Sequence, residues 1–164
     1  TQTGSGNIGA TNVYRSVSKK AGVVVLLLDA IKPIIALLVI EYFDPNFFSK
    51  FKYLIFFFSI TGHIFPIWLK FKGGKGVATY VGILFSINLI YGFIFCISWL
   101  LTFFLSKYSS LSSLIASLVV PVYLFLVNGE QIIFYIILFV LIFYTHRENI
   151  KRLKNKEESK SKIY

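Results

Sequence analysis

Residues 21–43 read AGVVVLLLDAIKPIIALLVIEYF, an apolar run interrupted in its middle by Asp29 and Lys32. A stretch of about 18 or more mostly apolar residues is long enough to cross a bilayer as a helix. Further apolar runs occupy residues 53–69, 77–106, 114–127 and 132–145. This pattern predicts an all-α fold, a polytopic integral membrane helix bundle.

The run 77–106 is too long for a single span, because a span needs about 20 residues. We divide it near Asn88 into helices at 77–89 and 91–106, which gives about six transmembrane helices. With six spans, both ends of the chain lie on one side of the membrane. That side collects most of the cations: Arg15, Lys19, Lys20, Lys70, Lys72, Lys75, Lys107 and the tail. Because loops rich in Lys and Arg stay inside the cell, we expect this side to be cytoplasmic.

The composition agrees with a membrane protein. Hydrophobic residues make up 56% of the 164 residues and charged residues only 15%, against about 25% charged in soluble domains. A net charge of +10 would suggest nucleic acid in a soluble protein. Here the cations flank apolar runs, so topology and anionic lipid headgroups explain them, and we expect no nucleic-acid partner. No cluster of His, Cys and carboxylates predicts a metal site.

Residues 3–15 read TGSGNIGATNVYR and contain a literal G-x-G-x-x-G between Gly4 and Gly9. A dinucleotide fingerprint requires a βαβ unit, which membrane helices do not supply. A flexible linker is one alternative. We favour an anion site, because repeated glycines let backbone N–H groups converge on a charge. Ser5, Asn7 and Asn12 would add neutral donors.

A second glycine-rich loop, residues 70–76, reads KFKGGKG. It is not a Walker A sequence, so ATP binding of that kind is excluded. Glycines still let a phosphate approach the backbone closely, and lysine supplies charge. A solvated loop on the positive side of the membrane is the alternative interpretation.

A third polar segment, residues 146–153, reads HRENIKRL. If it is helical, His146 and Asn149 share a face at a spacing of three. The alternative is an ordinary interfacial histidine.

Asp29, Lys32 and His63 lie inside the apolar runs. Asp29 and Lys32 are also three residues apart, and such intramembrane charges either pair structurally or mark a functional site. Pro33 is expected to kink its helix, and His63 is a candidate buried polar anchor.

At these residues the chain resembles the bacterial PlsY family of integral-membrane glycerol-3-phosphate acyltransferases. The matching stretches are residues 4–15, 62–66, 70–79, 108–113 and 146–153, together with Asp29 and Lys32. Two positions depart from the pattern that we expect of the family. Pro33 stands where the family has glycine, which affects helix packing. Lys156, ahead of Glu158, also replaces a glycine, so we expect the tail helix to end differently.

The resemblance implies seven spans with the motifs on the cytoplasmic side of the bacterial inner (plasma) membrane. Residues 1–164 would then form a single transmembrane acyltransferase domain without its first helix, in line with the absence of methionine. Residues 146–164 would form a basic cytoplasmic tail.

The resemblance also implies the reaction. Acyl phosphate and glycerol 3-phosphate would give 1-acyl-glycerol 3-phosphate and inorganic phosphate, the first step of phospholipid synthesis. It implies no cofactor, metal or ATP and no acyl-CoA or acyl-carrier protein, and it suggests a functional link to an enzyme that produces acyl phosphate. The His-x4-Asp pattern of soluble-type acyltransferases is absent, because His63 leads to Trp68 and His146 to Lys151.

The site residues follow from the same motifs. The catalytic candidates are Ser5, Asn7, His146 and Asn149. The substrate-binding candidates are Gly4, Gly6, Asn12, Arg15, Lys72, Gly73, Gly74, Lys75, Gly76, Ser110 and Ser113.

In this hypothesis the glycine backbone at 73–76, with Ser5 and Asn7, holds acyl phosphate. Arg15 and Lys75 hold glycerol 3-phosphate. Catalysis is then mostly positioning and charge stabilisation. His146 acts either as a base or only as an orienting group, with the phosphate of the substrate taking the proton. A covalent Ser5 intermediate is less favoured, because no local base is evident.

Three rival readings stay open from sequence alone. A transporter would place its polar groups near the bilayer midplane, whereas most polar residues here lie in loops. A membrane scaffold would not need three motifs rich in glycine and asparagine. An enzyme fragment, inactive without its first helix, is the third alternative.

Overall fold

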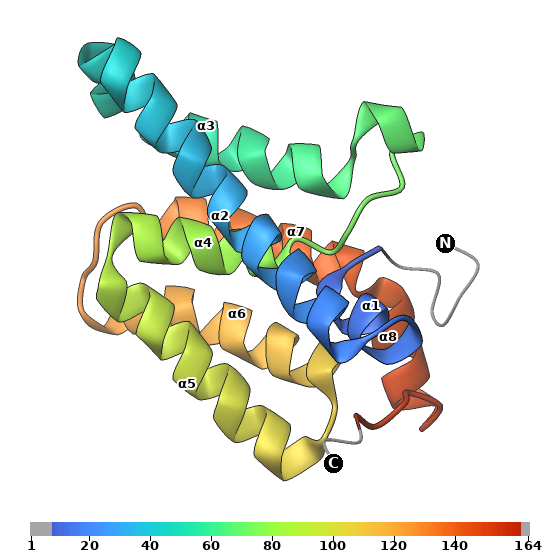
Figure 1. Ribbon diagram of the computed structural model, residues 1–164. Coiled ribbons are helices and arrows are strands. Elements are labelled where there is room, and N and C mark those ends of the chain that lie inside the picture. The colour runs from blue at the N-terminus through green and yellow to red at the C-terminus, as the bar shows by residue number, and fades with distance from the viewer. Residues whose placement is uncertain (1–7, 162–164) are drawn as a thin grey trace. The chain divides into compact units, whose positions relative to one another are not determined.

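The computed structural model describes residues 8–161, and helices form all the regular secondary structure in that range (Figure 1). The prediction of an all-α membrane protein is therefore confirmed. The elements are α1 Ala10–Ser16, α2 Lys19–Phe43, α3 Pro45–Ile64, a 3-10 turn η1 Ile67–Leu69, α4 Val77–Ile87, α5 Leu89–Ser106, α6 Ser109–Leu126, α7 Ile132–Thr145 and α8 Arg147–Lys154. They form two compact units, and the boundary lies between Ile87 and Asn88.

Apolar helices occupy all six predicted positions, but they differ in their capacity to cross a bilayer. In the described part of the chain, four helices, α2, α3, α5 and α6, are long and apolar enough, or up to five if α7 and α8 count as one bent span. The 11 residues of α4 rise only about 16 Å at 1.5 Å per residue, against a hydrocarbon core of about 30 Å. The count of about six therefore holds for apolar helices and not for full-length spans.

Helix α3 begins earlier and ends earlier than the predicted run 53–69. Asp44 caps its start, where one carboxylate oxygen accepts the Phe47 N–H at 2.9 Å, and Pro45 occupies the first helical turn. Both are standard helix-start residues. The polar stretch 45–52 is thus helical and not a loop. The helix stops at Ile64, because Pro66 disfavours helical geometry at the residue before it.

Helix α6 begins at Ser109, five residues before the start of the predicted run 114–127. The Ser112 and Ser113 hydroxyls donate to the carbonyls of Tyr108 and Ser109 at 2.8 and 2.9 Å. Serine side chains can bond the carbonyl four residues back within a helix. The serine-rich sequence is therefore compatible with a buried helical start.

The predicted division near Asn88 is confirmed. Helix α4 ends at Ile87, and the Asn88 side chain accepts the Ile90 N–H at 2.8 Å to cap α5. An asparagine at this position satisfies one of the open amides of a new helix. The predicted run at 132–145 coincides with α7.

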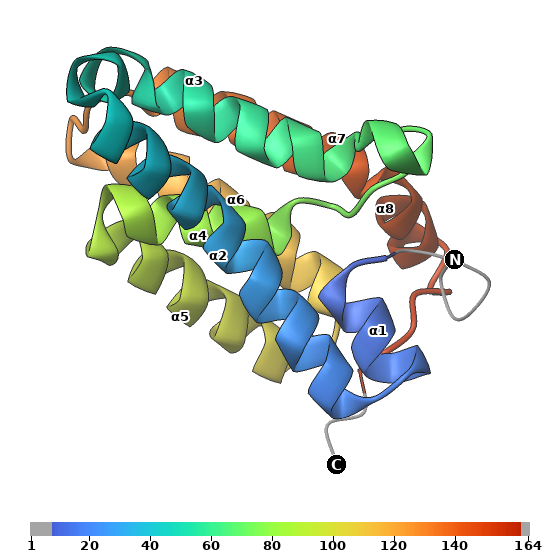
Figure 2. The same cartoon turned by 45° about the horizontal axis from the view of Figure 1, so that its top comes forward.

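In the first unit, α1, α3 and α4 all pack against α2, and α2 and α3 form the hairpin that runs from blue through teal to green in Figure 2. Pro33 lies buried inside α2, which continues to Phe43. Gly82 of α4 faces this part of α2, and a methyl group there would overlap the Ala30 carbonyl oxygen and approach the Pro33 ring. The proline is accommodated because glycine stands opposite it.

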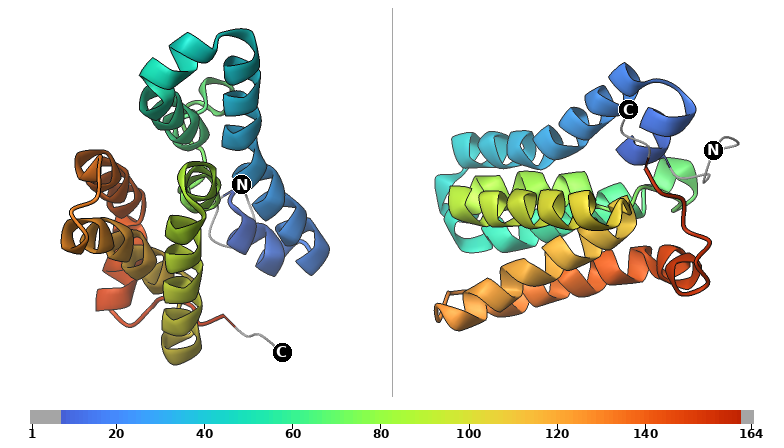
Figure 3. Two further views of the ribbon diagram at one scale, coloured as in Figure 1. Left: turned by 90° about the vertical axis from the view of Figure 1, so that its left-hand side faces the viewer. Right: turned by 90° about the horizontal axis from the view of Figure 1, so that it is seen from below.

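In the second unit, α6 packs between α5 and α7, and Figure 3 shows these helices in yellow, gold and orange. The buried face of α6 includes Ala116, Ser117, Val120 and Leu124. Small residues let neighbouring helices approach closely, which is the usual basis of packing in membranes. The Trp99 and Phe103 rings of α5 stack with centroids 4.9 Å apart.

We predict that Gly82→Ala destabilises the protein, because its methyl group would meet the fixed backbone carbonyl of Ala30. The expected loss is about 1–3 kcal/mol, as for other overpacked sites. Gly62→Ala is the matched control, since no atom lies within 4 Å of the added carbon and alanine favours a helix by about 1 kcal/mol. Thermal unfolding in detergent measures both, and equal effects at the two positions would contradict the tight α2–α4 contact.

Candidate functional site

The first predicted motif is described only from Ile8 onward. Gly4, Ser5, Gly6 and Asn7 lie outside the described residues. Gly9 caps α1 with its carbonyl, which accepts the N–H groups of Asn12 and Val13 at 3.0 and 3.2 Å. Asn12 accepts the Ser16 hydroxyl at 3.3 Å, and Arg15 is exposed in the last turn of α1. The role of this motif in substrate binding stays a prediction.

The second motif is a tight loop that folds back on the end of α3. The Gly73 N–H donates to the Ile64 carbonyl at 3.0 Å, and the Gly74 N–H donates to the His63 carbonyl at 3.2 Å. These are among the carbonyls that the end of a helix leaves without intrahelical partners. Side chains at Gly73 or Gly74 would overlap atoms of this helix end. The two glycines are therefore required by close approach.

This geometry refines the predicted phosphate site. The amides of Gly73 and Gly74 bond the protein itself, so the donors that the motif offers a phosphate lie farther along. Gly76 has φ +82° and starts α4, whose first-turn N–H groups favour anions. Thr79 in that turn is completely buried, and within residues 8–161 its hydroxyl has no hydrogen-bond partner. Lys75 is half-buried between the glycines and this turn, whereas Lys72 is exposed.

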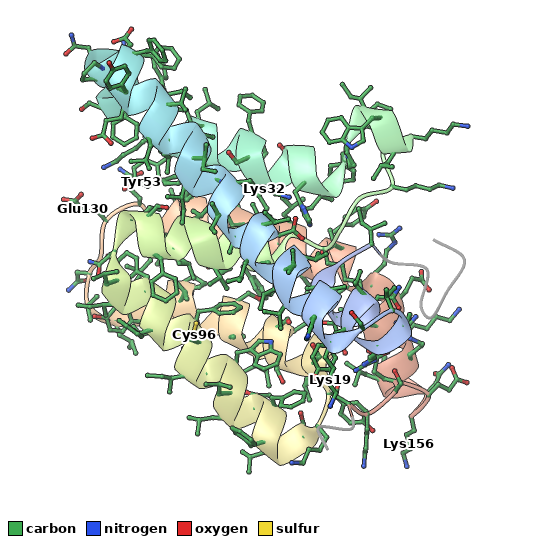
Figure 4. All side chains as sticks on the ribbon, viewed as in Figure 1. Lys19, Lys32, Tyr53, Cys96, Glu130 and Lys156 are labelled. Carbon is green, nitrogen blue, oxygen red and sulfur yellow. The ribbon has the colours of Figure 1, made fainter. Side chains whose placement is uncertain are left out.

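Three polar side chains between α2 and α3 form a cluster beside this loop. Lys32 donates to the Asp29 carboxylate at 2.8 Å and to Nδ1 of His63. His63 Nδ1 lies 3.4 Å from the same Asp29 oxygen. Lys32 of α2 is labelled in Figure 4. The structure thus confirms the Asp29–Lys32 pair and shows that the predicted buried anchor His63 joins it.

The cluster borders a cavity of about 530 Å³ within the first unit. Its polar lining is contributed by Asp29, Lys32 and His63, and by Ser59 of α3. The apolar lining includes Ile8, Val25, Phe58, Pro66, Trp68 and Leu69. In the described residues, no three His, Cys, Asp or Glu side chains form a group that could hold a metal ion.

In the second unit, His146 lies at a 60° bend between α7 and α8. It is 3% exposed, and its Nδ1–H donates to the Ile142 carbonyl at 2.8 Å. Because a carbonyl can only accept, this bond assigns the ring proton of the neutral form to Nδ1. The lone pair then sits on Nε2, which is the form a general base requires. The third motif is helical from Arg147, as predicted.

Asn149 and Ser110 meet at one buried carboxylate. Glu158 Oε1 accepts from the Ser110 hydroxyl and from the Asn149 side-chain amide, both at 2.7 Å. Its other oxygen accepts from Arg152 Nε at 2.7 Å. Burial raises the pKa of the Glu158 carboxyl, but these three hydrogen bonds and the Arg152 charge together hold the pKa below its ordinary value. Glu158 therefore links two of the predicted site residues, Ser110 and Asn149.

The predicted substrate-binding residue Ser113 is also buried and hydrogen-bonded. Its hydroxyl donates to the Ser109 carbonyl at 2.9 Å and accepts Trp99 Nε1–H at 3.1 Å. These bonds link α5 to α6. The structure gives Ser113 a role in helix packing, and its contact with substrate stays a prediction.

Helix α8 ends in a Schellman turn, even though lysine occupies its left-handed position. Lys156 has φ 60° and its N–H donates to the Leu153 carbonyl at 3.2 Å. The Glu157 N–H donates to the Arg152 carbonyl at 2.8 Å. This turn normally contains glycine. The expectation that Lys156 changes the helix end is wrong in this respect, because the backbone takes the glycine-type conformation and directs the chain toward Glu158.

Sequence reasoning did not include Glu158 or His63 among the site residues. Glu158 was noted only as a neighbour of Lys156, and nothing in a basic tail marks one carboxylate as buried. A carboxylate five residues after Leu153, the last apolar position of α8, was the available signal. His63 was recognised only as an anchor, because its contact with Gly74 crosses a turn that the sequence does not specify.

A family model described as glycerol-3-phosphate acyltransferase matches residues 1–156. The chain belongs to the glycerol-3-phosphate acyltransferase family. Among curated members, the enzyme of Pelagibacter ubique (strain HTCC1062) is 59% identical over 164 residues, which cover 98% of this chain and 82% of that protein. The enzyme of Brucella canis (strain ATCC 23365) is 45% identical over 159 residues, which cover 96% and 77%.

Solved structures of this acyltransferase family show the same fold. The crystal structure of PlsY, an integral membrane glycerol 3-phosphate acyltransferase, in its glycerol 3-phosphate form superposes with a TM-score of 0.84 at 36% identity. The match covers 98% of this chain and 80% of that one. The lysophosphatidic acid form of PlsY gives a TM-score of 0.82 at 36% identity, with 96% and 81% covered. The predicted family is confirmed.

We predict that Glu158→Gln destabilises this acyltransferase by about 2 kcal/mol, as for lost hydrogen bonds to a charged group. The NH₂ group of the glutamine can only donate, so it would face another donor on Ser110, Asn149 or Arg152. Glu157→Gln removes the same charge from an exposed neighbour and should change stability by less than about 0.5 kcal/mol. Thermal unfolding in detergent compares the two variants.

The same carboxylate adds a pH dependence of known sign. Because the folded pKa of Glu158 lies below its ordinary value of 4.5, its contribution to stability is complete above that value. The contribution is lost as the pH falls through the folded pKa. The stability of Glu158→Gln should lack this acid-sensitive contribution. Identical profiles of stability against pH for the wild type and Glu158→Gln would argue against the buried, hydrogen-bonded carboxylate.

We predict that Lys156→Gly stabilises the α8 turn by about 1 kcal/mol, because glycine adopts the left-handed conformation without the penalty of a side chain. The Lys156 side chain is exposed (Figure 4), so its removal costs no packing. Asn155→Gly is the control, because Asn155 has an ordinary helical φ of −81°. This change should not stabilise the protein. A lower unfolding temperature for Lys156→Gly would contradict the assigned turn.

Proposed function

We propose that this acyltransferase moves a fatty acyl group from acyl phosphate to the hydroxyl of glycerol 3-phosphate. The products are 1-acyl-glycerol 3-phosphate and inorganic phosphate, in the first step of phospholipid synthesis. The family match over residues 1–156 carries the proposal. The PlsY structures in glycerol 3-phosphate and lysophosphatidic acid forms support the acceptor and the product. The acyl phosphate donor rests on the resemblance and on the phosphate-type motifs.

The first unit supports a phosphate-binding role through its second motif. The loop presents Lys75 next to the start of α4, where first-turn N–H groups carry partial positive charge. An ammonium group and a helix start together suit a phosphate more than any neutral ligand. Arg15 adds a guanidinium that can bind a second phosphate bidentately. Ser5, Asn7 and the glycines before Ile8 complete the proposed set.

In the proposed reaction the acceptor hydroxyl oxygen attacks the acyl carbon. The bond from that carbon to the phosphate oxygen breaks, and phosphate leaves with the electron pair. The donor is already activated, so the protein need only position both substrates and stabilise negative charge. The hydroxyl proton passes to Nε2 of His146 or to a phosphate oxygen. The Nδ1–H bond of His146 to Ile142 supports the first route, because it holds the ring in the required tautomer.

Asn149 would orient the acceptor with its side-chain amide, and Glu158 would hold that amide in place. The location that we propose is the bacterial inner membrane with the motifs facing the cytoplasm, supported by the Lys and Arg content of those segments. An enzyme that makes acyl phosphate would be the functional partner. This arrangement delivers a water-labile donor and a soluble acceptor to one face of the membrane.

We predict that the purified protein releases inorganic phosphate only when acyl phosphate and glycerol 3-phosphate are both present. His146→Ala should lower kcat by about 10²–10⁴-fold if the ring is the base. The exposed neighbour Glu148→Gln should retain wild-type activity. Phosphate release is followed by a colorimetric assay, with acyl-CoA as the alternative donor in parallel.

Each outcome bears on a separate part of the proposal. Use of acyl-CoA in place of acyl phosphate would reject the donor and keep the acyltransferase class. Undiminished activity of a folded His146→Ala protein would remove the role of His146. Accumulation of either substrate inside sealed vesicles without any acyl transfer would favour the transporter hypothesis.

A further inference from the structure

The His63 side chain is held between two structural features that are distant in sequence. On one side its Nδ1 contacts Lys32, which is paired with Asp29 of the same helix α2. The His63 side chain is 7% exposed and that of Asp29 is 18% exposed. The same Nδ1 lies 3.4 Å from an Asp29 carboxylate oxygen, so both members of the ion pair face this atom of the ring.

The opposite edge of the ring lies against Gly74. A methyl group built on Gly74 would overlap Nε2 of His63 and lie 2.7 Å from Cε1. The backbone of the two residues is also joined, because the Gly74 N–H donates to the His63 carbonyl at 3.2 Å. His63 therefore contacts the loop twice, once through its main chain and once through its ring.

Packing alone does not fix the ring, because the cavity of about 530 Å³ borders His63, Asp29 and Lys32. On that side the ring has few neighbouring atoms to resist displacement. The directional contact with Lys32 supplies the missing restraint. Since Lys32 is itself paired with Asp29, the ion pair on α2 lies directly against the His63 ring.

A displacement at Gly74 would be passed directly to the residues that follow it. Lys75 is the next residue, and Gly76 at φ +82° begins the entry into α4. Gly74 and Gly76 are both buried, so the loop has little freedom to absorb a shift between them.

We propose that Asp29, Lys32 and His63 are positioning residues for the glycine loop, acting through the contact between the His63 ring and Gly74. The cluster sets the loop geometry in which Lys75 and the start of α4 bind the phosphate of a substrate. This inference rests on the proposed function, because it assumes that a phosphate-bearing substrate binds at this loop. None of the three residues needs to touch the substrate.

A double-mutant cycle between His63 and Gly74 tests the proposal. Gly74→Ala pushes a methyl group into the ring, His63→Ala removes the ring, and the double variant restores the space. Gly73→Ala provides a matched control, because its methyl group would meet the backbone oxygens of His63 and Ile64. Removing the His63 side chain cannot relieve that second clash.

We expect Gly74→Ala to lower kcat/KM by up to about 100-fold, the effect of a misplacement of roughly 1 Å. Most of the change should appear in the KM of a phosphate-bearing substrate. The His63→Ala/Gly74→Ala variant should recover at least about tenfold of this loss, an interaction that distant sites do not show. His63→Ala/Gly73→Ala should recover nothing.

Asp29→Asn is the second arm, since it keeps the shape of the side chain and removes the charge that holds Lys32. Asp29→Asn should raise the KM for the phosphate-bearing substrate, as His63→Ala should. Ser59→Ala, at the edge of the same cavity, should leave that KM unchanged. Thermal unfolding in detergent is recorded for every variant. Activity losses that follow the unfolded fraction, with KM unchanged, would overturn the positioning role.

The outcomes separate the two proposals. A wild-type protein inactive with acyl phosphate and glycerol 3-phosphate would reject the proposed function. An active wild type with additive losses in the His63–Gly74 cycle would reject the positioning role alone. Equal recovery in the Gly73 and Gly74 pairs would also reject it, because the ring contact would then have no specific effect.

Discussion

The carbonyl oxygens of His63 and Ile64 must find donors where α3 stops, and the first unit is organised around that requirement. Pro66 prevents the helix from continuing and so leaves these carbonyls without intrahelical partners. The amides of Gly73 and Gly74 close this end at 3.0 and 3.2 Å. The two glycines are needed because the loop lies against the helix end, and this fixes where Lys75 and α4 begin.

The second unit meets the same requirement with side chains. Glu158 is a carboxylate whose side chain is only 8% exposed, and an unpaired charge there would be strongly unfavourable. Ser110, Asn149 and Arg152 satisfy it from α6 and α8. The left-handed conformation of Lys156 directs the chain so that this contact forms. A strained backbone residue therefore persists because the surrounding hydrogen bonds hold it in place.

Helix positions were predictable from the sequence because lipid-facing and buried residues are both apolar, so a run of such residues signals a helix. Helices α3 and α6 start earlier than the apolar runs 53–69 and 114–127 predict, because polar residues form their first turns. The Asp44–Pro45 start signal was present and was not used. At Ser109–Ser113 the hydroxyls bond their own helix, a possibility that composition does not distinguish from a solvated linker. The half-length of α4 follows from Asn88, which the sequence did identify.

By itself the sequence determined the helical class, the places of the six apolar helices, the Asp29–Lys32 pair and the family, because each depends on residues near one another in the chain. The tertiary structure alone decided that His63 lies against Gly74, that two loop amides are used by α3, and that Glu158 joins Ser110 to Asn149. These contacts link residues between 9 and 48 positions apart. Periodicity and propensity describe neighbours along a helix, whereas the closure of such contacts depends on how the helices pack.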